Sequence, residues 1–161
     1  MAVSKHAMRV LRGGAALVVA ALLSACAATA VQPSAAVPLP FETIDQTRQS
    51  QIAAPRTVVV RDAASWARLW AEHAGADVAA PPVDFTAEMV VGVFLGTRES
   101  GCHATDIVAI ERLGERIRVR EADKVPGPAV RCMMMLTAPA HLVVTARSDA
   151  RVEFTTETVM L

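Results

Sequence analysis

The sequence predicts a mainly β domain: a compact antiparallel β-sandwich or curled sheet of six to seven strands with one covering helix. Residues 89–95 form an unbroken apolar run rich in valine, which is typical of a strand covered on both faces. Residues 116–120, RIRVR, alternate strictly between charged and apolar side chains, as a half-exposed strand does. The predicted strands are joined mostly by short connections, which favours antiparallel pairing.

The N-terminal residues are predicted to be a secretory signal and not part of the fold. Three basic residues precede an uncharged apolar stretch over residues 13–23, and this order is typical of a signal peptide. The sequence LSAC then ends at Cys26 and resembles the lipobox of bacterial lipoproteins. The resemblance implies that residues 1–25 are a lipoprotein signal peptide and that the Cys26 thiol carries acyl chains such as palmitate, which hold the chain on a membrane of the cell envelope.

The residue after Cys26 indicates which membrane holds the anchor, and the length of the apolar stretch leaves one alternative to a cleaved signal. Ala27, and not aspartate, follows the cysteine, and resemblance to sorted lipoproteins then favours the outer membrane, facing the periplasm or the surface. The alternative is an uncleaved membrane helix over residues 13–31, because a span needs about 20 apolar residues. Alanine and glycine dominate the second half of that stretch and Pro33 follows it, so the cleaved signal is the favoured interpretation.

The mature chain is predicted to be one domain on a tether. Residues 26–45 are the lipidated flexible tether, since most of them belong to an uncharged stretch rich in alanine and proline, and residues 46–161 are the domain. Three of the 16 basic residues lie in the signal, so 13 basic residues remain against 16 acidic ones, a net charge of −3. That balance provides no basic surplus for binding nucleic acid.

The most strongly indicated helix covers residues 63–74. Asp62 is the predicted N-cap, and Gly75 stands where a C-terminal glycine belongs. Four side chains at i, i+3, i+4 and i+7 make one stripe: Trp66, Leu69, Trp70 and His73. We expect this stripe to pack on the sheet, with His73 at the helix end near the negative pole of the dipole, and not to bind a ligand.

The remaining elements follow from local patterns. Further strands are predicted over residues 50–53, 57–61, 102–112, 131–137, 141–147 and 151–158. Loops are predicted over residues 77–85, 97–101 and 124–129, with a tight turn at residues 113–115. Three consecutive methionines in residues 131–137 indicate adaptable packing and not a copper site.

Two cysteines remain after lipidation, and an oxidising compartment favours a disulfide between Cys102 and Cys132. Closing a loop of about 30 residues should contribute on the order of 3 kcal/mol. The alternative is a reactive Cys102 thiol beside His103. Adjacent residues on a strand point to opposite faces, however, so that pair is badly placed for contact.

The sequence shows no catalytic or metal-binding pattern, and we predict neither an enzyme nor a cofactor. No zinc-like spacing, glycine-rich phosphate loop or Gly-x-Ser-x-Gly elbow occurs. A Ser/His/Asp set could be assembled on paper from Ser100, His103 and Asp106, but such a set is recognised by geometry and not by sequence position.

Short motifs across residues 62–154 resemble, in their order, the C-terminal domain of the PrcB-type protease-complex subunit. They are the Trp66 and Trp70 helix, VDF before EMVV, VFLG, Ser100-Gly101, VPG, LTAP and HLVV. The resemblance implies a non-catalytic envelope lipoprotein domain that binds or stabilises a partner protein, such as a secreted or surface protease complex.

Two segments are the candidate partner-binding loops. Their residues are Thr97, Arg98, Glu99, Ser100, Gly101, His103, Pro126, Gly127 and Pro128. Two alternatives stay open. A glycine-containing loop after a β-strand is also how small β-sandwich protease inhibitors present their wedge, and a structural envelope lipoprotein would have no dedicated partner.

Overall fold

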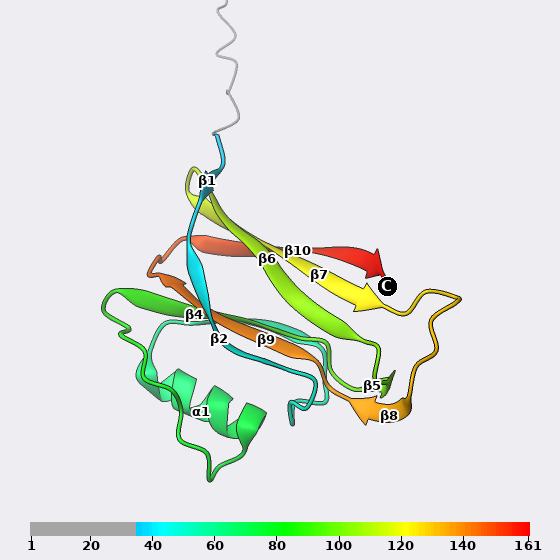
Figure 1. The fold of residues 1–161 in the computed structure, drawn as a ribbon. Helices are drawn as coiled ribbons and strands as arrows, with labels where there is room; N and C mark the ends of the chain where they lie inside the picture. Colours follow the sequence, from blue (N-terminus) through cyan, green and yellow to red (C-terminus); the bar gives the residue numbers. More distant parts are fainter. Residues whose placement is uncertain (1–34) are drawn as a thin grey trace, which may run out of the picture. The chain divides into compact units, whose positions relative to one another are not determined.

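The computed structural model describes residues 35–161, and these form ten strands and one helix (Figure 1). The predicted signal peptide and the predicted lipidation site Cys26 lie outside the described residues. One sheet, called the β6 sheet, has the order β1 (Val37–Pro38), β6 (Ala104–Leu113), β7 (Arg116–Val125) and β10 (Arg151–Met160). The second, called the β4 sheet, has the order β2 (Phe41–Thr47), β9 (Ala140–Ala146), β4 (Glu88–Phe94) and β3 (Arg56–Val60). A separate ribbon pairs β5 (Arg98–Ser100) with β8 (Met134–Thr137), so the mainly β fold class is confirmed.

The apolar run at residues 89–95 is the centre of the domain, as predicted. Val90 and Phe94 face the helix α1 (Ala63–Ala74) and belong to one core cluster. Met89, Val91 and Val93 face the β6 sheet and belong to a second cluster, between the two sheets. Because side chains alternate across a strand, a strand with apolar residues at every position can be covered on both faces.

Gly92 interrupts this run for a packing reason. A Cβ atom at this position would lie 2.6 Å from Cδ2 of Leu142 and 2.9 Å from Cγ2 of Val58. Both of these side chains come from the strands that flank β4. The missing side chain therefore gives its two neighbours the space under the helix.

The helix begins and ends where the sequence predicts. The Asp62 carboxylate accepts a hydrogen bond from the Ser65 backbone N–H at 2.8 Å. Gly75 has a φ of 107° and donates its N–H to the Ala71 carbonyl. Trp66 and Trp70 are buried on the sheet with ring centroids 5.2 Å apart, so the predicted packing stripe is confirmed.

The boundary predicted for the tether is wrong. Val37 already pairs with Arg112, and β2 pairs along its length with β9, so the domain begins near residue 37 and not at residue 46. Residues 50–53 were predicted as an edge strand, but only Gln49, just before them, makes an isolated bridge. The edge strand β2 is half exposed and carries a bulge, which removes the regular alternation that reveals a strand.

Strand direction departs from the prediction at one pair. The other strand pairs in the described residues are antiparallel, but β10 runs parallel to β7 in an unbroken register from Arg151 opposite Arg116. The cause is the connection from β9 to β10, which carries the chain from the β4 sheet to the β6 sheet instead of turning back within one sheet. The total of ten strands exceeds the predicted six to seven because several strands, such as β1 and β5, are very short.

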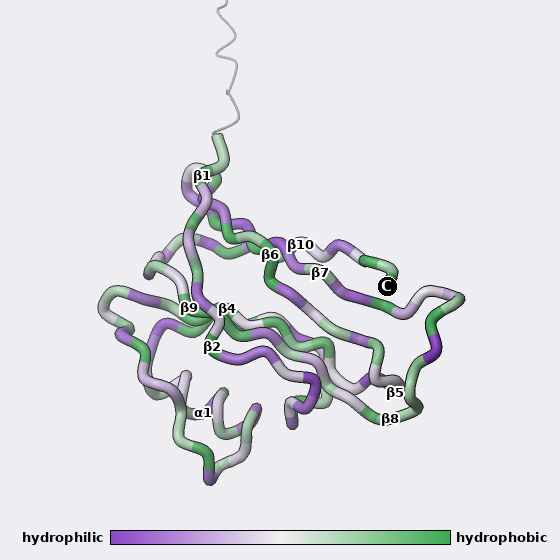
Figure 2. The backbone as a smooth tube through the Cα atoms, viewed as in Figure 1, coloured by the Kyte–Doolittle hydropathy of each residue, from purple (hydrophilic) through white to green (hydrophobic). Residues whose placement is uncertain are grey.

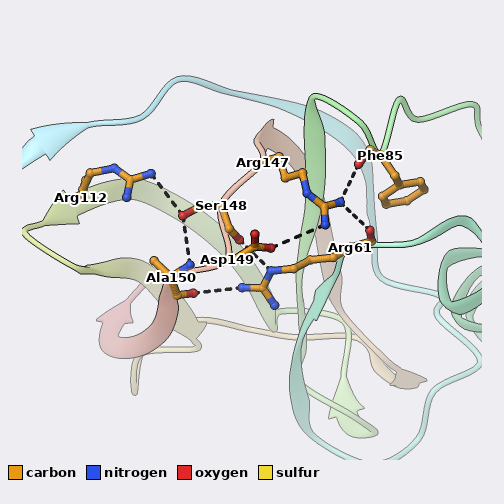
Figure 3. A network of polar contacts seen from close by, with 7 residues as sticks. All are labelled: Arg61, Phe85, Arg112, Arg147, Ser148, Asp149 and Ala150. Carbon is orange, nitrogen blue, oxygen red and sulfur yellow. Dashed lines mark hydrogen bonds and ion pairs between the residues drawn. The ribbon is translucent and has the colours of Figure 1, made fainter.

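Two arginines fix this crossing turn (Figure 3). Arg61 donates from Nε to the Ser148 carbonyl at 2.7 Å and from Nη2 to the Ala150 carbonyl at 3.1 Å. Arg147 donates from Nη1 to the carbonyls of Arg61 and Phe85 at 2.9 and 2.6 Å. Arg61, just after β3, thus satisfies the backbone of the turn that leads to β10, and Arg147 of the turn satisfies carbonyls beside the β4 sheet.

Candidate functional site

A two-stranded ribbon at one end of the β6–β7 hairpin contains most of the predicted contact residues. We call residues 98–103 together with 132–137 the methionine ribbon. The residues predicted as a loop at 97–101 include strand β5, which pairs with β8 with Arg98 opposite Thr137. Thr137 donates its hydroxyl to the Ser100 carbonyl at 3.0 Å, and Gly101 donates its N–H to the Met133 carbonyl at 3.0 Å.

The predicted disulfide closes the free end of this ribbon. Cys102 and Cys132 are bonded, with Cα atoms 5.6 Å apart and a sequence separation of 30. The bridge follows directly after the last ribbon hydrogen bond, from Gly101 to Met133. The alternative of a free reactive Cys102 thiol is therefore wrong. Because the ribbon has few hydrogen bonds, the disulfide is the covalent constraint that holds its two strands together.

The strand predicted over residues 131–137 is shorter, Met134–Thr137, and the methionines for which adaptable packing was predicted lie on the surface. Met133, Met134, Met135 and Leu136 are 76, 84, 40 and 70% exposed. Only Met135 turns partly inward, where its sulfur would lie 3.2 Å from a Cβ at Gly101. The ribbon has just two strands, so side chains on both of its faces reach solvent. In Figure 2 the hydrophobic colour continues from the preceding loop into β8.

The predicted contact residues of the first loop lie on this ribbon or at its base. Thr97 donates its N–H to the Ala53 carbonyl at 2.9 Å and holds the base to the domain. Glu99 is exposed and lines a shallow hollow of about 330 Å³ with Met134 and Leu136. His103 follows the disulfide at the start of β6 and is half-buried.

The second predicted loop lies at the same end but has a different neighbour. Ala104 pairs with Lys124, so the segment with Pro126, Gly127 and Pro128 begins where the ribbon begins. A Cβ at Gly127 would lie 2.7 Å from the Leu161 carbonyl oxygen, and Leu161 donates its N–H to Val125. Gly127 is therefore packed against the C-terminal residue, whereas the first loop is packed against the methionines.

A linked Ser/His/Asp set does occur, but not at the residues that the sequence suggested. No hydrogen bond joins Ser100, His103 and Asp106 among the described residues. Instead, His73 contacts Ser50 Oγ through Nδ1 at 2.8 Å and Asp45 through Nε2 at 2.8 Å.

The hydrogen bonds of this second set assign it a structural role. The Asp45 carboxylate can only accept, so His73 Nε2–H donates to it, and in the tautomer that leaves Nδ1 as an acceptor the Ser50 hydroxyl donates to Nδ1 while Ser50 Oγ accepts from the Ile52 N–H. Ser50 and His73 are both buried. The set clamps the helix to β2 and the segment after it, and the expectation that His73 is a simple helix-end residue is incomplete. Long sequence separations hide such a clamp from pattern analysis.

His141 forms a second buried link, between the two sheets. Its Nδ1 accepts the Ile107 backbone N–H at 2.8 Å, so Nε2 carries the proton and donates to Thr43 Oγ1 at 2.9 Å. The contact lies at the bulge of the β6–β7 ladder. Burial lowers the pKa of His141, and the carboxylates of Asp106 and Asp45 only partly oppose this effect. A neutral imidazole is thus built into the fold.

This link predicts a loss of stability in mild acid. The folded-state pKa of His141 lies below its ordinary value of 6.5, so the unfolded chain binds the proton more tightly. The contribution of His141 to the free energy of unfolding should be at its maximum when the pH is above the ordinary histidine pKa. It should decrease as the pH drops below that value, by at most about 1.4 kcal/mol per pH unit for one histidine. Urea unfolding between about pH 7.5 and 5.5 should show this slope, and His141→Asn should flatten it. Equal slopes in both proteins would contradict the assignment.

Comparisons with protein-family models, curated proteins and solved structures find no match to this chain. The PrcB-type resemblance therefore stays a prediction. Within residues 35–161, the helix is neither long nor apolar enough to span a bilayer. No group of three or more histidine, cysteine, aspartate or glutamate side chains in that part of the chain could hold a metal ion.

Proposed function

We propose that this chain is a non-catalytic envelope lipoprotein domain that binds a partner protein through the methionine ribbon. The observation that carries the proposal is the exposure of four consecutive apolar side chains, Met133 to Leu136, on a ribbon closed by a disulfide. Following the PrcB-type resemblance, a secreted or surface protease complex is the proposed class of partner.

The chemistry of the ribbon suits protein binding. Complete burial of an apolar side chain of this size is favourable by about 1.5–3 kcal/mol. The isolated domain does not gain this free energy at the exposed positions, whereas a complex with a partner would. Methionine is unbranched and adapts to irregular surfaces, so a methionine-rich patch can fit a partner without a preformed pocket. Strands β5 and β8 also pair only with each other in the described sheets, so each offers an edge to an added strand.

The ribbon lies far from the point where the chain enters the domain. The chain enters the domain where Val37 pairs with Arg112, near the end of β6, whereas the ribbon adjoins Ala104 at the start of that strand. Eight residue steps of a strand separate the two positions by about 27 Å.

The central test is site-specific photo-crosslinking of the full chain in its native membrane. A photoreactive residue at Met134 should give a discrete adduct with one protein. The matched control is Val108, which is also an exposed apolar residue but lies on the broad face of β6. Adducts of equal yield from both positions, or from neither, would overturn the ribbon as the contact surface.

We further expect that Met134→Glu combined with Leu136→Glu weakens partner binding by about tenfold or more, because charged groups would be buried in the contact. The free energy of unfolding should change by no more than about 0.5 kcal/mol, since both side chains are exposed in the domain. Val108→Glu should leave binding intact. Binding that survives the double substitution at full strength would count against the proposal.

No feature of the described residues specifically favours the alternative that the domain is a protease inhibitor. That alternative depended on a glycine-containing loop after the central strand. The segment forms strand β5, and Gly101 is packed against Met135.

A further inference from the structure

The side chains of β7 that face the other sheet change from apolar to acidic along the strand. Ile117 and Val119 are fully buried in the core between the sheets. Glu121 and Asp123 continue the same row, because side chains two residues apart share a face. Glu121 is therefore buried at the end of the apolar core, and the half-buried Asp123 follows it toward the edge of the sandwich.

These carboxylates line a cavity of about 390 Å³ between the two sheets. Glu121, Asp123 and Thr156 come from the β6 sheet, and Pro55, Val93 and Leu95 supply apolar wall from the β4 sheet and its flanks. Strands β3 and β10 are terminal strands of their sheets, and both contribute to the lining. The cavity is called the acidic cavity below.

Both carboxylates have a buried oxygen without a partner. Glu121 is only 6% exposed; its Oε1 accepts the Thr156 hydroxyl, whereas its Oε2 has no hydrogen bond among the described residues. Asp123 Oδ1 is likewise buried and unpartnered within residues 35–161. A buried carboxylate oxygen without a donor costs several kcal/mol, so a donor that enters the cavity would be bound favourably.

Arg56 also lines the cavity, but its guanidinium does not donate to the free oxygens of Glu121 and Asp123. The Arg56 guanidinium donates from Nη2 to Glu72 at 2.6 Å and lies 5.5 Å from the centre of the Phe94 ring. Its Nε is buried and has no acceptor among the described residues. Arg56 is thus directed toward Glu72 on the helix and leaves the two acidic oxygens free.

We propose that the acidic cavity binds a primary alkylammonium group, from a lysine side chain of a peptide or from a free diamine. An ammonium group has three donors on one atom, which suits single free oxygens on two different carboxylates. A guanidinium prefers both oxygens of one carboxylate, and Thr156 already occupies one oxygen of Glu121. The apolar wall is suited to the methylene groups behind the charge.

A divalent metal fits this site less well. Calcium takes six to eight oxygen ligands, and no group of three acidic, histidine or cysteine side chains in the described part of the chain could hold a metal ion. The inference goes beyond the proposed partner binding and is independent of it, because the acidic cavity and the methionine ribbon share no residue.

The test is NMR titration of the 15N-labelled domain with two amines, Nα-acetyl-lysine methylamide and 1,5-diaminopentane. We expect saturable shifts at residues lining the cavity, with no saturable shift from uncharged Nα-acetyl-norleucine methylamide or from calcium chloride. Tighter binding of the lysine derivative would assign the ligand to a peptide, and tighter binding of the diamine would assign it to free amines. Failure of both amines, or equal binding of the norleucine or calcium probe, would overturn the proposal.

Matched variants separate the site from general charge effects. Glu121→Gln should weaken amine binding by about tenfold or more, whereas Glu153→Gln, a more exposed carboxylate on β10, should not. Without ligand, Glu121→Gln should also raise the melting temperature, because it removes an unpaired buried charge. Asp123→Asn provides the second variant. Amine affinity that is unchanged in both cavity variants would overturn the assignment.

Discussion

Replacing Cys102 and Cys132 together by serine is expected to lower the free energy of unfolding by about 3–4 kcal/mol. The bridge closes a loop with a sequence separation of 30, and the chain-entropy model gives this magnitude for a loop of that size. Partner binding should fall as well, because the ribbon would lose its covalent closure. Urea unfolding followed by the fluorescence of Trp66 and Trp70 measures the first effect.

Reduction provides the matched control for that variant. Dithiothreitol should lower the stability of the wild-type domain to that of the double serine variant and should not change the variant itself. If the double variant lost less than about 1 kcal/mol, the ribbon hydrogen bonds and the Thr97 anchor would suffice to hold the segment, and the disulfide would not be the main constraint.

Phe94→Ala is expected to lower the free energy of unfolding by about 3–5 kcal/mol, the usual range for a buried phenylalanine. Phe94 is 2% exposed and lies in the core between β4 and the helix. Its ring centroid is 5.5 Å from that of His73, which the clamp to Ser50 and Asp45 holds in place. The neighbours of the lost ring are therefore poorly able to collapse into the space.

Phe85→Ala tests whether that loss depends on burial. Phe85 is only partly buried against the same core, so its removal should cost clearly less than removal of Phe94. Denaturant unfolding of both variants gives the comparison. Equal losses from the two substitutions would mean that the core under the helix is less tightly packed than its burial indicates.

The elements with local signals were predictable from the sequence. Asp62 and Gly75 mark the ends of the helix because capping depends on neighbouring residues alone. Gly114 marks the β6–β7 turn, where its φ is 61°. The apolar run that became β4 was recognisable because continuous valine-rich sequence has few other uses in a small domain.

The elements decided by distant contacts were not predictable. Strand β2 is polar because it is an edge strand, so its pairing with β9 left no periodic pattern. The parallel direction of β10 depends on which sheet the chain reaches after Arg147, a tertiary property. The exposure of Met134 was missed because an apolar run is the same in sequence whether it is covered or left in solvent.

The sites divide in the same way. The cysteine count and the oxidising compartment implied by the predicted signal sufficed to predict the disulfide. The clamp joins His73 to Ser50 and Asp45, which lie 23 and 28 positions earlier in the sequence. No local sequence pattern indicates these contacts. The acidic cavity did leave a signal: extending the RIRVR alternation by three residues places Glu121 and Asp123 on the inward face.

The order of strands in the β4 sheet has a consequence for biogenesis. One of the two inner strands of that sheet is β9, whose Thr145 meets Phe41 of β2 on one side and Met89 of β4 on the other. A ribosome or a translocase releases the chain vectorially, so both early strands must wait for a segment that emerges about a hundred residues after the first of them. Topologies closed by such late pairings fold slowly. Until β9 emerges, β2 and one edge of β4 therefore stay unpaired, as the export implied by the predicted signal would require.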